Sequence, residues 1–130
     1  MLSTTSTPNF TIGVSANTTQ GTYNGSGVLA VSPTTAMPSS VTNVPWEMDV
    51  TITCASTGAA GSFLSGGMWK LYPTTSTITA LRVSSGTANP NPAYTLSTET
   101  AYYLELFGAW GTNNAANSIS VYNVVVHGDN

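Results

Sequence analysis

The stretch of sequence that decides the fold is Trp46-Glu-Met-Asp-Val-Thr-Ile-Thr-Cys54. Its even-numbered positions are apolar, and its odd-numbered positions carry carboxylates or hydroxyls. Apolar residues at a spacing of two predict a half-buried β-strand with one face toward a core. The pattern places Cys54, the only cysteine, on the apolar face, so we expect a small core residue and not a reactive thiol.

Further segments of the chain have the same extended character and are separated by turns rich in Gly, Pro and Asn. No segment shows a convincing 3.6-residue helical period. The sequence therefore predicts an all-β protein, an antiparallel β-sandwich of the jelly-roll or immunoglobulin-like type with seven to nine strands. The best-defined strands are expected at residues 9–15, 27–32, 46–54, 68–72, 77–83, 93–96, 101–107 and 118–126.

The length of 130 residues suits a single domain with one core. We expect a flexible N-terminal arm at residues 1–8, a β-sandwich at residues 9–127 and a short C-terminal tail at residues 128–130. The opening residues have neither the basic region nor the apolar run of a signal peptide. No stretch approaches the roughly 18 apolar residues of a membrane-spanning helix. We expect no membrane or secretory address.

Charged side chains are rare, with 2 Lys or Arg, 5 Asp or Glu and a formal net charge of −3. The surface must instead be covered by neutral polar groups from 22 Thr, 16 Ser and 11 Asn. Two basic residues cannot build the positive stripe that neutralises phosphates, so we expect neither nucleic acid nor an anionic membrane as a partner. A surface with few flexible charged side chains loses less rotamer entropy when it packs against a neighbour or a sugar.

No pattern of catalytic or metal-binding residues is present. His127 is the only imidazole and lies near the end of the chain, and one Cys with one His cannot complete a structural zinc site. Glu47 and Asp49 share one side of their strand about 7 Å apart, within the range of glycosidase carboxylates, but no apolar sequence around them would raise a pKa. We therefore expect no enzymatic activity, no metal and no cofactor.

Trp110 is the best candidate for ligand binding because it lies between glycines and is followed by Asn113 and Asn114. An aromatic ring can stack on the C–H face of a sugar while amides hydrogen-bond to its hydroxyls. The alternative interpretation is that Trp110 folds back over the open end of the sandwich.

The segment at residues 101–107 is largely apolar on both faces, so it is central in a sheet or covers an interface. Tyr103, Glu105 and Phe107 share one of these faces and are the candidate subunit-interface residues.

In general character, the whole chain, including the closing Ile119-Ser-Val-Tyr-Asn-Val-Val-Val126, resembles accessory structural proteins of tailed bacteriophages, especially capsid decoration (cement) proteins and β-sandwich modules of fibres. The resemblance implies a homotrimer, assembled in the host cytoplasm and located in the virion, that stabilises the shell by binding the major capsid protein or other virion proteins. The alternative is a module that binds a carbohydrate or a host receptor, such as a surface glycan, through Trp110 and the Asn-rich loop.

Overall fold

The computed structural model describes residues 1–21, 27–73, 78–85 and 93–128, and this part of the chain is all-β, with no helix. All paired strands are antiparallel, as the sequence predicts. Four of the strands have only two residues. The strands are β1 (Leu2–Ser3), β2 (Asn9–Asn17), β3 (Val28–Val31), β4 (Thr35–Ala36), β5 (Trp46–Ser56), β6 (Ser62–Leu71), β7 (Thr79–Ser84), β8 (Tyr94–Thr95), β9 (Tyr103–Trp110) and β10 (Ser118–Ile119).

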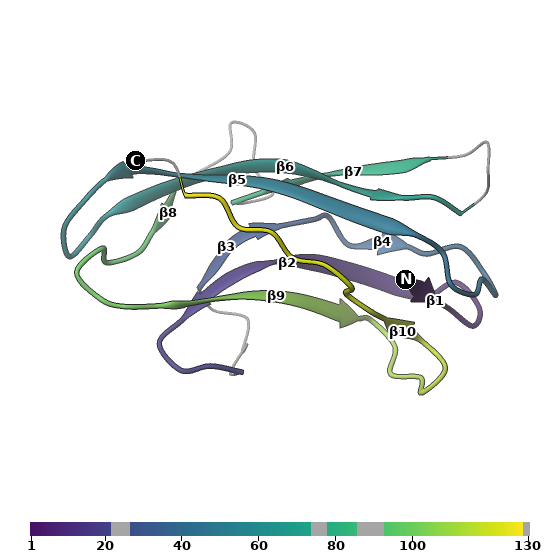
Figure 1. The fold of residues 1–130 in the computed structure, drawn as a ribbon. Coiled ribbons are helices and arrows are strands. Elements are labelled where there is room, and N and C mark those ends of the chain that lie inside the picture. The colour runs from purple at the N-terminus through teal and green to yellow at the C-terminus, as the bar shows by residue number, and fades with distance from the viewer. Residues whose placement is uncertain (22–26, 74–77, 86–92, 129–130) are drawn as a thin grey trace.

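Eight of the strands form the two layers of a β-sandwich, and β1 pairs with β10 as a separate two-stranded sheet (Figure 1). In one layer β2 is central, with β9 on one edge and β3 and β4 on the other. In the other layer β6 lies between β5 and β7 and also pairs with β8. The layers are joined on one side only, where Val31 of β3 pairs with Ser84 of β7. On the opposite side β5 and β9 are the two outermost strands.

Local sequence explains the longest hairpin, β5 with β6. The alternation in β5 is matched across the ladder, because Trp46 is opposite Leu71 and Met48 is opposite Trp69. Directly opposed residues project to the same face of a sheet, so these pairs build one apolar surface. The connection turns at Gly58, whose φ of 109° suits glycine, and the amide of Gly61 donates to its carbonyl. The strands expected at residues 68–72 and 77–83 fall in β6 and β7, which pair as neighbours, and residues 74–77 between them lie outside the described residues.

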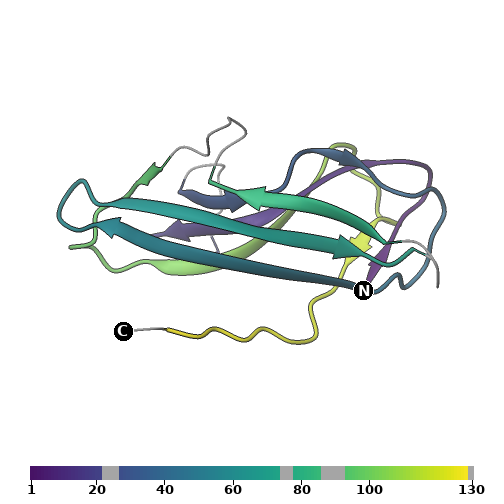
Figure 2. The ribbon, with the colours of Figure 1, turned by 90° about the horizontal axis from the view of Figure 1, so that it is seen from above.

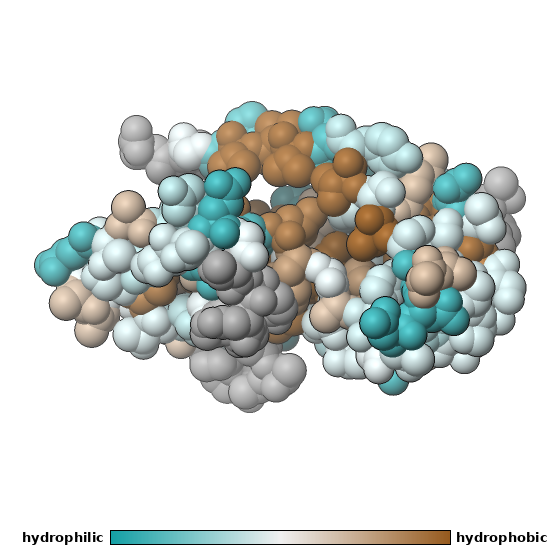
Figure 3. Space-filling view, turned by 90° about the horizontal axis from the view of Figure 1, so that it is seen from below, coloured by the Kyte–Doolittle hydropathy of each residue, from teal (hydrophilic) through white to brown (hydrophobic). Residues whose placement is uncertain are grey.

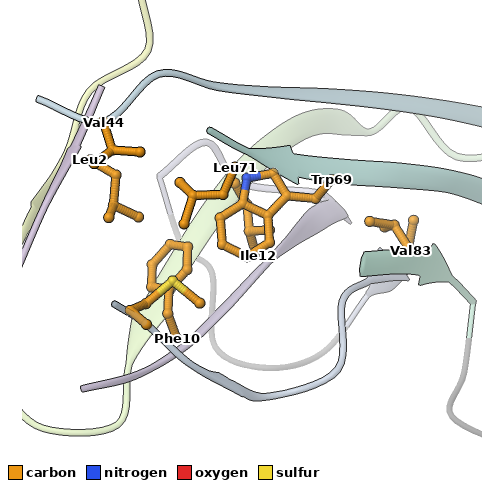
Figure 4. Close-up of a cluster of buried hydrophobic side chains, with 9 residues drawn as sticks. Leu2, Phe10, Ile12, Val44, Trp69, Leu71 and Val83 are labelled. Atoms are coloured by element: carbon orange, nitrogen blue, oxygen red, sulfur yellow. The ribbon is translucent and has the colours of Figure 1, made fainter. Parts of the chain in front are cut away.

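The core fills the space between the layers (Figure 4). Trp69 and Phe10 are fully buried and pack as tilted rings with centroids 5.6 Å apart. Seven further buried residues pack around these two rings, and they come from both layers, from the N-terminal β1 and from the connection between β4 and β5: Leu2, Ile12, Ala30, Met37, Val44, Leu71 and Val83.

The predicted flexible arm at residues 1–8 is wrong for its first residues. Leu2 is fully buried in the core, and its amide and carbonyl both hydrogen-bond to Val44. Thr4 is also buried and its hydroxyl donates to the carbonyl of Pro38. A stretch this short has no periodicity to reveal burial, and its partners lie about forty residues away along the chain.

Two other predictions need correction. The last strand was expected at residues 118–126, but only Ser118–Ile119 is paired, as β10 against β1. Ser120 still exchanges backbone hydrogen bonds with Met1, and residues 121–128 follow as extended chain that belongs to no strand. Cys54 is exposed instead of buried, because it lies near the end of β5, where the inner face has no opposing layer.

Candidate subunit interface

The inner face of β9 is incompletely covered. Leu104 lies opposite Ala16 and Leu106 opposite Val14, on the face that carries the buried Ile12. Both leucines therefore point toward the space between the layers, yet Leu104 is 58% exposed and Leu106 is 37% exposed. The described strands of the second layer leave both side chains in contact with solvent.

The inner face of β5 shows the same deficiency. Its residues are only partly buried, although Trp69 and Leu71, their neighbours on β6, are fully buried. Burial therefore decreases across this layer, from β6 toward its edge. The partly buried inner-face residues are Trp46, Met48, Val50 and Ile52. We call the region between these residues and Leu104 and Leu106 the open side of the sandwich.

Both strands that border the open side also have free backbone edges. Within the described residues, β5 pairs only with β6, and β9 pairs only with β2. A shallow cavity of about 450 Å³ follows β9 and is lined by Gln20, Gly21 and the consecutive residues 103–107. Consecutive residues of a strand alternate between its faces, so this cavity lies along the unpaired edge.

Residues 120–128, which we call the C-terminal segment, pass this open side as extended chain (Figures 1 and 2). The amide of Ser120 donates to Met1, and beyond it no backbone hydrogen bond to a described residue is present. Most of the segment is apolar and exposed; Tyr122 is 80% exposed and Val126 is 76% exposed. Figure 3 shows hydrophobic residues on both sides of a gap between this segment and the body of the protein.

The three interface residues predicted from the sequence lie on the outer face of β9, away from the open side. Phe107 is only 7% exposed and lies against Gly13 of β2. The Glu105 carboxylate accepts hydrogen bonds from the Asn17 side chain at 2.6 Å and from the Gly21 amide. Tyr103 is about half exposed. With Glu105 and Phe107, Tyr103 also lines the cavity along the edge of β9. The exposed apolar residues on the inner face are Leu104 and Leu106, which the sequence placed on the same strand but could not assign to an open face.

Two residues of the predicted sugar platform, Trp110 and Asn114, have contacts within the protein. Trp110 is partly buried against the core and its ring centroid is 4.4 Å from that of Phe10, which matches the alternative interpretation of a ring folded over the sandwich. Asn114 uses its side-chain oxygen to accept the amide of Ala116 at 3.0 Å. Asn113 is exposed. Little of the Trp110 ring remains for a ligand.

The charged residues of β5 and β6 lie on the outer face of their layer. The Lys70 ammonium and the Tyr72 hydroxyl each donate to the Glu47 carboxylate at 2.7 Å. These two hydrogen bonds hold the pKa of Glu47 below its ordinary value. A general acid of a glycosidase needs a raised pKa, so the electrostatics of Glu47 do not favour that role beside Asp49.

Comparison of the chain with models of protein families, with characterised proteins and with solved structures finds no match. Among the described residues there is no helix long and apolar enough to cross a membrane. In the same part of the chain, no three His, Cys, Asp or Glu side chains are grouped as metal ligands would be.

Proposed function

We propose that this protein is a structural subunit that works by associating with further copies of itself, as a capsid decoration protein of a virion does. The observation that carries the proposal is the open side, where apolar side chains of the inner faces of β5 and β9 remain in contact with solvent. Soluble monomers rarely leave a continuous apolar surface uncovered, and such surfaces mark protein interfaces.

The free energy available from this surface is large compared with the stability of a small domain. Burying one Val or Leu side chain fully is worth about 1.5–3 kcal/mol. Leu104 and the C-terminal segment together leave several such side chains more than half exposed. An association that covered a few of these side chains would offset part of the free-energy cost of the freedom lost on binding.

The contact is apolar and uncharged, which supports a role in a virion particle. No charged residue lies among the inner-face residues of β5 or β9, because Glu47, Asp49 and Glu105 all project to the outer faces. Contacts of this kind do not weaken when salt screens charges. The proposal places the protein, as a homotrimer, on the capsid shell, in contact with the major capsid protein or another virion protein.

The first test is the solution mass of the purified chain by light scattering, across concentrations and from low to high salt. We expect a multiple of 13.4 kDa, three times that mass for the trimer, with no loss of association at high salt. Leu104→Asp should reduce the mass toward that of one chain, whereas Thr53→Asp, on the exposed outer face of β5, should leave it unchanged. A mass of 13.4 kDa at every concentration contradicts the proposal.

The location is tested separately with antibodies raised against the purified chain. Gold-labelled antibodies should decorate intact virus particles in electron micrographs. Labelling of free protein without labelling of any particle contradicts the virion assignment but leaves self-association standing.

A further inference from the structure

We propose that residues 120–127 of one copy form an additional β-strand on the open side of a second copy, between its β5 and β9. The inference rests on the proposed function and names the contact that would hold the subunits together. Each copy then donates one segment and accepts another.

The open side has the properties of a site for one strand. β5 and β9 each present an unpaired backbone edge, and an exposed edge of this kind pairs with another extended chain. The inner faces of both strands supply apolar side chains that one added strand would cover. The cavity beside β9 leaves residues 103–107 of this strand open to solvent along its edge.

The C-terminal segment has the properties of a strand without a sheet. Its sequence, Ser-Val-Tyr-Asn-Val-Val-Val-His over residues 120–127, is rich in β-branched and aromatic residues, which favour strands. Its eight residues equal the length of β9. It also carries no Asp, Glu, Lys or Arg, in agreement with the uncharged faces of the open side.

The occupant is a second copy because the segment is apolar on both faces. Val121 and Val125 share one face, and Tyr122, Val124 and Val126 share the other. On the first face Val121 is 46% and Val125 63% exposed, and on the second face the three side chains are 65–80% exposed. The segment's own body therefore covers neither face, although the segment passes its open side (Figure 1). A strand with two apolar faces is covered on both sides.

The exchange also explains how copies form a closed assembly. Donor and acceptor surfaces are different parts of the chain, so the contact is heterologous, and a heterologous contact closes into a ring when its rotation permits. The segment leaves the body at β10, which is anchored by pairing with β1 and by packing of Ile119 against the core. A fixed origin limits the directions in which the segment can reach its neighbour.

The test compares two tail variants that add the same charge. Val124→Asp places a carboxylate on the face with three apolar side chains, and Asn123→Asp places one on the opposite face, in place of an amide of nearly the same shape. Light scattering should show the wild-type and Asn123→Asp proteins associated and Val124→Asp monomeric, with association weakened at least 100-fold. Hydrogen exchange should show amides 121–127 protected in the wild type and exposed in Val124→Asp.

A mixing experiment then identifies the donor. One chain ends at Ser120 and keeps the open side; the other is full-length Leu104→Asp, which keeps the segment. Each should be monomeric and folded by circular dichroism, and together they should form a 1:1 complex. Persistence of two monomers in the mixture overturns the inference. Association of the wild type while amides 121–127 exchange freely also overturns the inference, but it leaves the proposed function standing. A monomeric wild type overturns both, including when its amides 121–127 are protected by its own open side.

Discussion

Leu106 of β9 lies directly opposite Val14 of β2 on the inner face of the same layer, yet Val14 packs against the core and Leu106 is more than one-third exposed. Leu106 lies one strand farther than Val14 from the joined edge of the sandwich. Each strand step from β3 toward β9 moves an inner-face residue away from the opposing layer. The exposure of Leu106 is therefore caused by the lack of an opposing strand and not by a polar sequence.

The first prediction concerns the close packing of β2 against its neighbours at Gly13. A Cβ at this position would collide with the carbonyl oxygen of Ala30 and lie 2.8 Å from the ring of Phe107. Gly13→Ala should therefore reduce the free energy of unfolding by about 1–3 kcal/mol, measured by urea denaturation. Gly66→Ala is the matched control, because nothing lies within 4 Å of its Cβ position. Equal midpoints for the two variants would contradict the described register of β2 and β9.

The second prediction concerns Trp69, the largest fully buried side chain. Its removal in Trp69→Ala should cost about 3–5 kcal/mol, through lost apolar burial and the cavity left beside Phe10. Trp69→Phe should cost much less, because the indole nitrogen has no hydrogen-bond partner among the described residues and its loss removes an unpaired donor. Thermal unfolding followed by circular dichroism would rank the two variants. A Trp69→Phe variant as unstable as Trp69→Ala would argue that the nitrogen is satisfied.

How much of this arrangement the sequence predicts depends on the range of the interactions. The strand at residues 46–54 follows from alternation, and it is confirmed as part of β5. The strands expected at residues 68–72 and 77–83 fall in β6 and β7, which pair with each other. The burial of Leu2 could not be predicted, because it depends on Val44 and on β10, over a hundred residues away. Local pattern carries no information about such partners.

The candidate interface illustrates the same limit. The sequence correctly marked residues 101–107 as apolar on both faces, but the choice of Tyr103, Glu105 and Phe107 depended on which face lacked a cover. Whether a face of β9 is covered depends on the opposing layer, and the sequence of β9 carries no information about that layer. The pattern also predicted a strand at the C-terminal segment. Its composition is strand-like, but within one copy it passes the free edges of β5 and β9 without pairing with a described residue beyond Ser120.

A third prediction concerns the ionisation of Glu47. Its carboxylate accepts hydrogen bonds from Lys70 and Tyr72, so its pKa in the folded protein lies below the ordinary 4.5. The stabilisation from these bonds is present above pH 4.5 and is lost as the pH falls through the lowered pKa. Lys70→Met should raise the pKa of Glu47 more than Tyr72→Phe does, because the Lys70 hydrogen bond is the larger cause. Carboxyl chemical shifts followed by NMR measure both, with Tyr103→Phe as a control that leaves the titration unchanged.

The fourth prediction separates the core role of Trp110 from the sugar platform. The ring packs on Phe10, so Trp110→Ala should reduce the free energy of unfolding by about 2–4 kcal/mol, and Trp110→Phe should recover part of the loss. A glycan array with the wild-type protein should show no binding that depends on Trp110. The carbohydrate-binding alternative predicts the reverse, namely unchanged stability in Trp110→Ala and lost binding.

The last prediction uses Cys54 as a reporter of the open side. The thiol is exposed in a single copy, and Cys54 follows Ile52 on the inner face of β5, so a thiol reagent such as Ellman's reagent should modify it without unfolding. A strand inserted from a second copy would cover this face. Modification should therefore be slower in the associated wild type than in monomeric Val124→Asp, and Asn123→Asp should match the wild type. Equal rates in all three proteins would place the contact between copies away from this end of β5.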